Sequence, residues 1–321
     1  MTETTANDKQ TIAQNLKGRD FLSLTDYSTE EILYLIDLAI DLKHKQKNGE
    51  IYQPLKGKTL GMIFEKSSTR TRVSFEVGMY QLGGHALFLS KDDLQLGRGE
   101  TIRDTGRTMS RYLDGIMLRT FAHRNVIELA RGATVPVING LTDMAHPCQA
   151  LADYQTIYEK KGRLKGLKLA YIGDGNNMVQ SLMVGAAKLG VHIAVATPPG
   201  YEPKQEVLES CKEYAEKSGA VIELTHDPKE AASQADVIYT DVWASMGFED
   251  EHEERLKVFQ PYQVNLELVQ HAKDDFLFMH CLPAKRGEEV SDAVIDGEHS
   301  IVFDQAENRL HAQKAIMAAI M

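Results

Sequence analysis

Cysteine is scarce in this sequence. The 321 residues contain only Cys148, Cys211 and Cys281, which lie far apart and form no CxxC pair. This pattern excludes a disulfide framework, gives no spacing typical of a zinc site and fits a reducing compartment. The N-terminal stretch MTETTANDKQTIAQ lacks the apolar core of a secretory signal and the Arg-rich pattern of a transit peptide. We therefore expect a frayed cytoplasmic tail there.

Long apolar runs and excess basic charge are also missing. No apolar run approaches the roughly 20 residues that a membrane helix needs, so no membrane partner is expected. Lysine and arginine number 36 against 46 acidic residues, a net charge of −10. This balance argues against a nucleic-acid partner, whereas an anionic small substrate can still bind where basic residues are concentrated locally.

A dinucleotide fingerprint is incomplete as well. The segment GDGNN, residues 173–177, lacks the third glycine of GxGxxG. We therefore expect no nicotinamide cofactor, and the sequence indicates no other cofactor and no metal.

Alternating apolar runs and helical patterns are what the sequence does contain. They predict an α/β fold of two Rossmann-like domains with parallel sheets. The predicted domains are residues 1–150, joined by a C-terminal helix over 305–321 that packs back, and residues 151–304, with an interdomain helix starting at Pro147. Expected strands cover 59–65, 85–90, 115–119, 135–139, 167–172, 192–198, 221–225, 236–242 and 276–280. Expected helices include 69–82, 101–113, 125–130, 178–190, 205–219 and 227–235.

One anion-binding pattern opens the helix that follows the first expected strand. Ser67 to Arg72, the run SSTRTR, supplies hydroxyl and guanidinium groups at a helix N-terminus, where free N–H groups and the helix dipole favour a phosphate. The alternative is that the hydroxyls only cap the helix and the arginines lie in solvent.

Strand ends supply further polar groups. Arg119 ends an expected strand, and His146 to Gln149, the run HPCQ, begins the interdomain helix. Fixed donors of this kind stabilise the negative charge that develops on a carbonyl oxygen under attack. By itself, a histidine before a proline is more often an ordinary loop residue.

In the second half, three segments could bind an amino acid. Asp241 opens DVWASMG at a strand end, Asn176 and Asn177 lie at a strand-to-helix turn, and His280 to Pro283 form HCLP. An aspartate after a strand is often only a cap, and Cys281 could be a buried residue beside a kinked proline. The four separated motifs together decide between these alternatives.

STRTR, HPCQ, DxxxSMG and HCLP, in this order, resemble the transcarbamoylase family over residues 20–321, and DVWASMG is typical of its ornithine carbamoyltransferases. The resemblance implies a carbamoyl-phosphate-binding first domain and an ornithine-binding second domain. It implies transfer of the carbamoyl group to the side-chain amine of L-ornithine, giving L-citrulline and phosphate, in arginine metabolism. The rival acceptors are putrescine and N-acetylornithine. A non-catalytic regulator and a nucleotide-binding dehydrogenase fit less well, because every motif is intact and the glycine fingerprint is broken.

The resemblance also implies roles for individual residues. The expected catalytic residues are Arg119, His146, Asp241 and Cys281. Carbamoyl phosphate is expected to bind Ser68, Thr69, Arg70, Thr71, Gln95, Arg119, His146, Gln149, Cys281, Leu282 and Arg309, and ornithine to bind Asn177, Asp241, Ser245 and Met246, while Arg72 is expected to be structural. Gln95 matches a residue that family members lend to a neighbouring subunit's site. A homotrimer, or a multiple of trimers, with shared sites is therefore expected.

Overall fold

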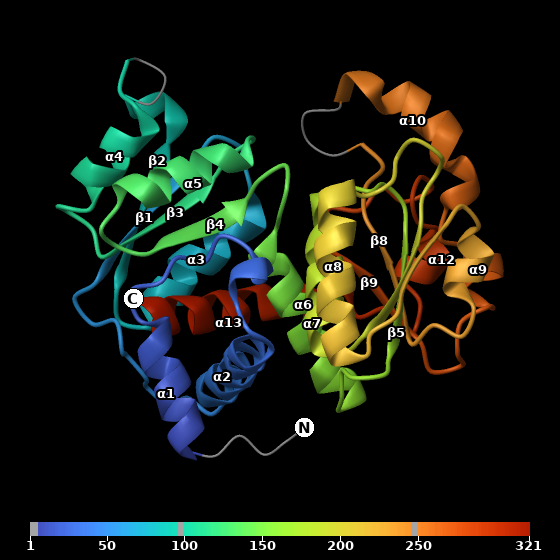
Figure 1. The fold of residues 1–321 in the computed structure, drawn as a ribbon, viewed down its shortest axis with the longest axis horizontal. Coiled ribbons are helices and arrows are strands. Elements are labelled where there is room, and N and C mark those ends of the chain that lie inside the picture. Colours follow the sequence, from blue (N-terminus) through green and yellow to red (C-terminus); the bar gives the residue numbers. More distant parts are fainter. Residues whose placement is uncertain (1–5, 96–98, 245–248) are drawn as a thin grey trace. The chain divides into compact units, whose positions relative to one another are not determined.

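The computed structural model describes residues 6–95, 99–244 and 249–321. Two compact units divide the chain: residues 1–155 with 307–321, and residues 156–306. Each unit is built on a parallel sheet flanked by helices (Figure 1), so the predicted α/β class with two parallel sheets is confirmed. Among the helices of the described residues, none combines the length and the apolar character needed to span a membrane.

The first unit contains a four-stranded parallel sheet in the order β2-β1-β3-β4. Its strands are β1 Thr59–Phe64, β2 His85–Ser90, β3 Gly115–Arg119 and β4 Val137–Leu141. Its helices are α1 Ala6–Leu16, α2 Thr29–Lys47, α3 Thr69–Gln81, α4 Ile102–Met109 and α5 His123–Gly132, with short 3-10 helices η1 Leu24–Asp26 and η2 Lys91–Asp93.

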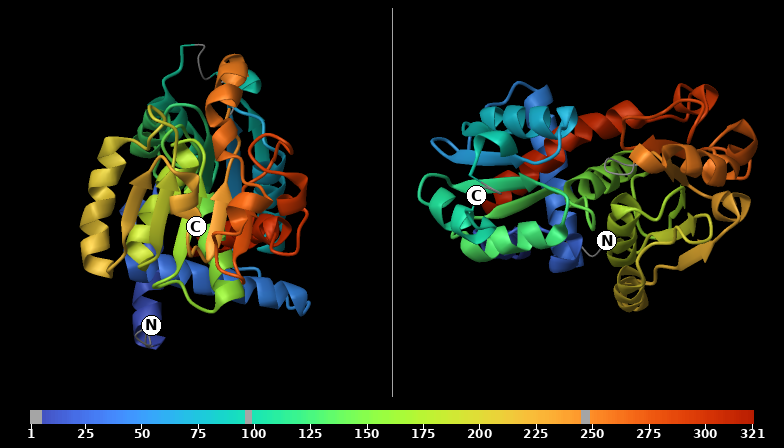
Figure 2. Two further views of the ribbon diagram at one scale, coloured as in Figure 1. Left: turned by 90° about the vertical axis from the view of Figure 1, so that its right-hand side faces the viewer. Right: turned by 90° about the horizontal axis from the view of Figure 1, so that it is seen from above.

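The second unit contains a five-stranded parallel sheet in the order β7-β6-β5-β8-β9, whose strands lie side by side in the left view of Figure 2. The strands are β5 Lys168–Ile172, β6 His192–Ala196, β7 Ile222–Thr225, β8 Val237–Thr240 and β9 Leu277–His280. The helices are α7 Asn177–Leu189, α8 Gln205–Ser218, α9 Pro228–Ala232, α10 His252–Phe259, α11 Leu266–Val269 and α12 Asp292–Ile295, with 3-10 helices η3 Glu249–Glu251 and η4 Gln260–Tyr262. Figure 1 shows α7 and α8 together on one face of this sheet and α9 on the other.

Two long helices each contain residues of both units. Helix α6, Pro147–Lys161, leads from the first unit into the second, and α13, Val302–Ile320, leads back. Within the first unit α13 packs on α3 at Gly78, where an added Cβ would come within 2.9 Å of Met317 Cε. This close approach brings the α13 residues of the first unit next to α3.

Element ends differ from the sequence-based expectations where local chemistry intervenes. The fourth strand begins at Val137, not at residue 135, since Pro136 has no N–H to give to the sheet. The helix expected over 227–235 ends at Ala232, because Gln234 adopts a left-handed backbone with φ of 57°. The helices α1 and α2 were not anticipated; Ser28 and Glu31 form a capping box at the start of α2.

The strand register decides which side chains meet at the carboxyl edge of each sheet. Phe64 pairs with Arg119, so β1 and β3 end side by side just before the SSTRTR segment. In the second unit Thr240 pairs with His280, so the residues after them, Asp241 and Cys281, are neighbours. Ligands of open α/β sheets bind at such edges.

Candidate active site

The N-terminus of α3 provides an anion-binding geometry. Ser68 is the N-cap, and its hydroxyl accepts a hydrogen bond from the Thr71 backbone N–H at 3.2 Å. The remaining N–H groups of the first turn and the positive end of the helix dipole then lie at the carboxyl edge of the first sheet. The geometry favours a phosphate at this position.

A buried cationic cluster surrounds Thr71. Arg119, at the end of β3, and Arg309, on α13, are 4% and 3% exposed. Their guanidinium groups donate to the Thr71 hydroxyl at 3.3 Å and 3.1 Å, and Arg309 also donates to Gln149 Oε1 at 2.6 Å. Gln149 in turn donates to Asp153 at 2.8 Å. Four residues expected to bind carbamoyl phosphate are therefore joined by hydrogen bonds within one unit.

His146 lies in the same cluster, directly before α6. Burial, followed by the positive charges of Arg309, Arg119 and Arg70, lowers the pKa of His146 well below its usual 6.5. The imidazole is therefore neutral at physiological pH and can donate one N–H to a carbonyl oxygen without adding a positive charge. The arginines supply the charge that attracts an anion.

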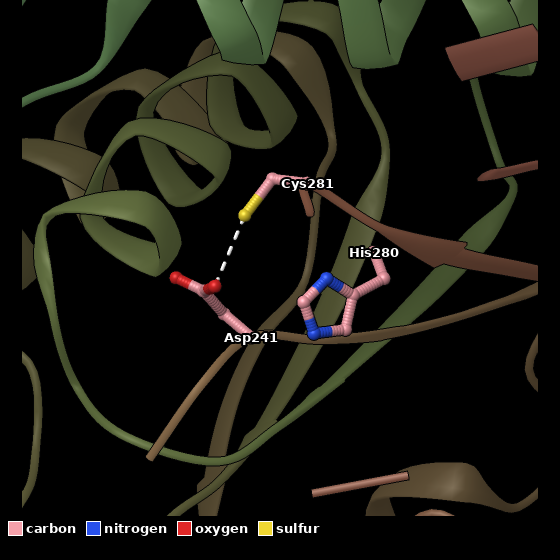
Figure 3. A group of neighbouring side chains, drawn as sticks. All are labelled: Asp241, His280 and Cys281. Atoms are coloured by element: carbon pink, nitrogen blue, oxygen red, sulfur yellow. Dashed lines mark hydrogen bonds between the residues drawn. The ribbon is translucent and has the colours of Figure 1, made fainter. Parts of the chain in front are cut away.

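The second unit assembles a separate group of side chains from three strand ends. The Cys281 thiol lies 3.0 Å from Asp241 Oδ1, a hydrogen bond drawn in Figure 3. Asn176 donates to the other carboxylate oxygen of Asp241 at 3.1 Å, while its own Oδ1 caps α7 by accepting from the N–H groups of Met178 and Val179. A half-buried thiol and a carboxylate held at this spacing can accept hydrogen bonds from an amine.

Asp241, His280 and Cys281 also lie close enough to suggest a metal site, since one potential ligand atom from each falls within 4.8 Å of the others. Both ring nitrogens of His280 already have hydrogen-bond partners, however. Its Nδ1 accepts from the Leu282 N–H at 2.9 Å, and its Nε2 faces Glu289 Oε1 at 3.1 Å. The described side chains therefore fit a metal ion poorly.

A buried ion pair lies beside the amino-acid site. Arg255, on α10, donates to Asp174 Oδ2 at 2.9 Å and to the backbone carbonyl of Trp243 at 2.8 Å. Burial raises the pKa of Asp174 to about 6, against the opposing attraction of Arg255. The pair thus connects the turn after β5 to the segment that follows Asp241.

Sequence reasoning missed several of these groups. Asp174 follows a strand in the GDGNN turn, which is a weak hint, but nothing in the local sequence around Arg255 or Glu289 marks it as a partner of the site. Asn177 stays the predicted ornithine contact, and the neighbouring Asn176, which the same turn supplies, donates its side-chain amide to Asp241.

The remaining expected residues are placed as follows. Gln95 is exposed beyond η2, and Ser245 and Met246 lie outside the described residues. Arg72 lies over the Phe88 ring at 3.8 Å and pairs with Glu76.

Comparison with known proteins identifies the family of this chain. Residues 19–159 match the family model "Aspartate/ornithine carbamoyltransferase, carbamoyl-P binding domain", and residues 165–320 match the corresponding "Asp/Orn binding domain". Curated proteins named "Ornithine carbamoyltransferase" from Anoxybacillus flavithermus and Oceanobacillus iheyensis are 67% and 65% identical to it. These matches cover 95% and 96% of the chain and 98% and 96% of the relatives.

Solved structures agree with these matches. The ornithine carbamoyltransferase from Pyrococcus furiosus has a TM-score of 0.93 and 61% identity, over 95% of this chain and 98% of that one. The enzyme of the same name from Gloeobacter violaceus has a TM-score of 0.85 and 48% identity, over 95% and 99%. The chain belongs to the aspartate/ornithine carbamoyltransferase family.

Proposed function

We propose that this protein transfers the carbamoyl group of carbamoyl phosphate to the side-chain amine of L-ornithine, giving L-citrulline and phosphate. The observation that carries the proposal is the 67% identity, over 95% of the chain, to a protein named ornithine carbamoyltransferase. The Asp241–Cys281 pair supports the choice of an amine as acceptor. The described part of the site favours neither putrescine nor N-acetylornithine.

The first unit's side chains suit carbamoyl phosphate. Ser68, Thr69, Arg70 and Thr71 would hold the phosphate at the N-terminus of α3, where N–H groups and guanidinium groups face an anion. Neutral His146, together with Arg119, would donate to the carbonyl oxygen and stabilise its charge in the transition state. Gln149 and Arg309 complete the set proposed for this unit, and Leu282 of the second unit and Gln95 of a neighbouring subunit are further proposed contacts.

The acceptor must lose a proton before it can attack. A lysine-like amine has a pKa of roughly 10.4, so its neutral form at pH 7 costs about 4 to 5 kcal/mol. Asp241 and Cys281 would orient the ornithine amine, with Asn177, Ser245 and Met246 as further contacts. The neutral amine nitrogen forms a bond to the carbamoyl carbon, and the bond from that carbon to the phosphate oxygen breaks. The first proton leaves the ammonium group before attack, and the leaving phosphate takes the second proton, which the nitrogen releases once it is bonded to the carbamoyl carbon.

A trimer is part of the proposal. Exposed apolar side chains lie on α3 and on the edge strand β2, with exposed fractions of 52% for Val73, 37% for Val77, 79% for Tyr80 and 39% for Phe88. Neighbouring apolar groups of this kind are typical of a protein interface. Light scattering would test it, and a monomer at assay concentration would contradict shared sites.

The three cysteines are free thiols, which supports a cytoplasmic location.

A substrate panel tests the reaction. Purified protein with carbamoyl phosphate and L-ornithine should form citrulline, and putrescine or N-acetylornithine should give far less carbamoylated product at equal concentration. The variant Asp241→Asn, which keeps the shape of the side chain and removes its charge, should lose most activity with ornithine. Faster reaction with either rival amine would overturn the ornithine assignment while leaving the carbamoyltransferase family intact.

A further inference from the structure

A buried histidine–glutamate pair lies behind the HCLP segment. The side chains of His280 and Glu289 are 0% exposed, and His280 Nε2 lies 3.1 Å from Glu289 Oε1. The same carboxylate oxygen accepts the Lys285 backbone N–H at 2.6 Å. Glu289 therefore contacts both the loop after β9, at the Lys285 N–H, and His280, the last residue of that strand.

The hydrogen bonds determine which ring nitrogen of His280 carries the proton. The Leu282 backbone N–H can only donate, and it lies 2.9 Å from His280 Nδ1. Nδ1 must therefore act as an acceptor, so the single ring proton of the neutral imidazole is on Nε2 and is donated to Glu289. A ring protonated on Nδ1 would place two donors face to face and break the contact with Leu282.

This contact lies at an uncommon point of the backbone. Leu282 has φ of 57°, in the left-handed region that residues with a side chain rarely adopt. Its amide is held there by His280, while the residue between them, Cys281, directs its thiol to Asp241 at 3.0 Å. The ring of His280 thus supports the two residues of this loop that belong to the proposed site.

We propose that His280 and Glu289 are positioning residues for carbamoyl transfer. Glu289 fixes the Nε2–H tautomer of His280, and His280 then holds the Leu282 amide so that Cys281 and Leu282 keep their orientation toward the substrates. This inference rests on the proposed function for its kinetic part, whereas the tautomer can be measured without any substrate. The simpler alternative is that the buried pair contributes to folding alone.

NMR of the protein labelled with ¹⁵N-histidine tests the tautomer directly. Among the 11 histidines, the His280 signals are those lost in His280→Gln. We expect Nδ1 at the chemical shift of an unprotonated nitrogen and Nε2 at that of a protonated one. A proton on Nδ1 would overturn the proposal, and because the measurement needs no substrate it stands even if the wild type forms no citrulline.

Kinetics of Glu289→Leu test the positioning role. We expect kcat to fall about 10-fold to 100-fold, by analogy with removal of the hydrogen-bond partner that orients a metal-ligating histidine, and the KM for ornithine to rise. Glu289→Gln keeps an amide oxygen that can accept from His280 and Lys285, so it should restore most of both parameters. The matched control is Glu298→Leu, because the Glu298 side chain is 91% exposed, and its kinetics should equal the wild type.

The positioning role and a role in folding alone predict different KM values for ornithine. Loss of folded enzyme lowers the apparent kcat and leaves the KM for ornithine unchanged, since the surviving molecules have an intact site. An unchanged KM in Glu289→Leu, with kcat falling only in proportion to the folded fraction, would show that the pair serves folding alone and would overturn the positioning role.

Discussion

Replacing Arg255 with methionine should destabilise the protein in a pH-dependent way. The side chains of Arg255 and Asp174 are 7% and 10% exposed, so methionine leaves a buried carboxylate without its cation. Removing one member of a buried ion pair costs about 3 to 5 kcal/mol. The expected loss at pH 8 is of that order, provided that Asp174 remains ionised.

Protonation of Asp174 limits this cost at lower pH. The pKa of Asp174 is raised from 3.8 to about 6 in the folded protein, which corresponds to about 3 kcal/mol. Because the folded pKa is the higher one, this contribution to stability is fully present below pH 3.8 and is lost as pH rises through 6. Without Arg255 the folded pKa rises further, so the Arg255→Met variant loses the contribution over a wider range.

Urea unfolding at pH 5 and pH 8 measures the difference. At pH 5 Asp174 is largely protonated in both folded proteins, so the variant leaves no unpaired buried charge and its loss of stability should be smaller than at pH 8. The control is Arg286→Met, which removes a surface ion pair to Asp296 with side chains 43% and 54% exposed, and should cost about 0 to 1 kcal/mol at either pH. An equal loss at both pH values, or one no larger than in the control, would refute the reasoning.

Three further predictions concern the reaction itself. Arg70→Ala should raise the KM for carbamoyl phosphate and lower kcat, so that kcat/KM falls about 10-fold to 150-fold for one lost charge-assisted hydrogen bond. The control is Arg107→Ala, which removes a surface ion pair whose arginine side chain is 65% exposed, and it should match the wild type. Normal kinetics for Arg70→Ala would discredit the phosphate site. Quenched turnover followed by mass spectrometry should detect no carbamoyl group on Cys281, since the transfer is direct, and an adduct there would mean a covalent intermediate. Activity should rise from pH 6 to pH 9 as the ornithine amine deprotonates, with the lowered pKa of His146 keeping that ring neutral throughout; a flat profile would contradict amine deprotonation as the limiting step.

Much of the fold and part of the site could be predicted because their signals are local. Strand-length apolar runs and helical periodicity depend on neighbouring residues, so the expected strands and helices agree with the structure to within a few residues. The cap of α3 also needs only a short segment: Ser68 binds the N–H of Thr71, three residues on. Exceptions such as the start of β4 and the end of α9 arose from single residues, Pro136 and Gln234, whose effects on boundaries are easily overlooked.

The sequence by itself determined the alternation of strands and helices from Thr59 onward, the helix N-terminus that can receive an anion, and the motifs that indicate the family. Only the tertiary structure decided which distant residues meet. Arg309 reaches Thr71 across 238 positions, and Arg255 reaches Asp174 across 81. The physical reason is that a buried charge or polar group needs a partner, but it can be satisfied by any suitable group that the packing of helices and strands brings near. The spacing of residues along the sequence does not indicate which group becomes the partner. The tautomer of His280 likewise depends on the Leu282 amide and the Glu289 carboxylate, which the fold places on either side of its ring.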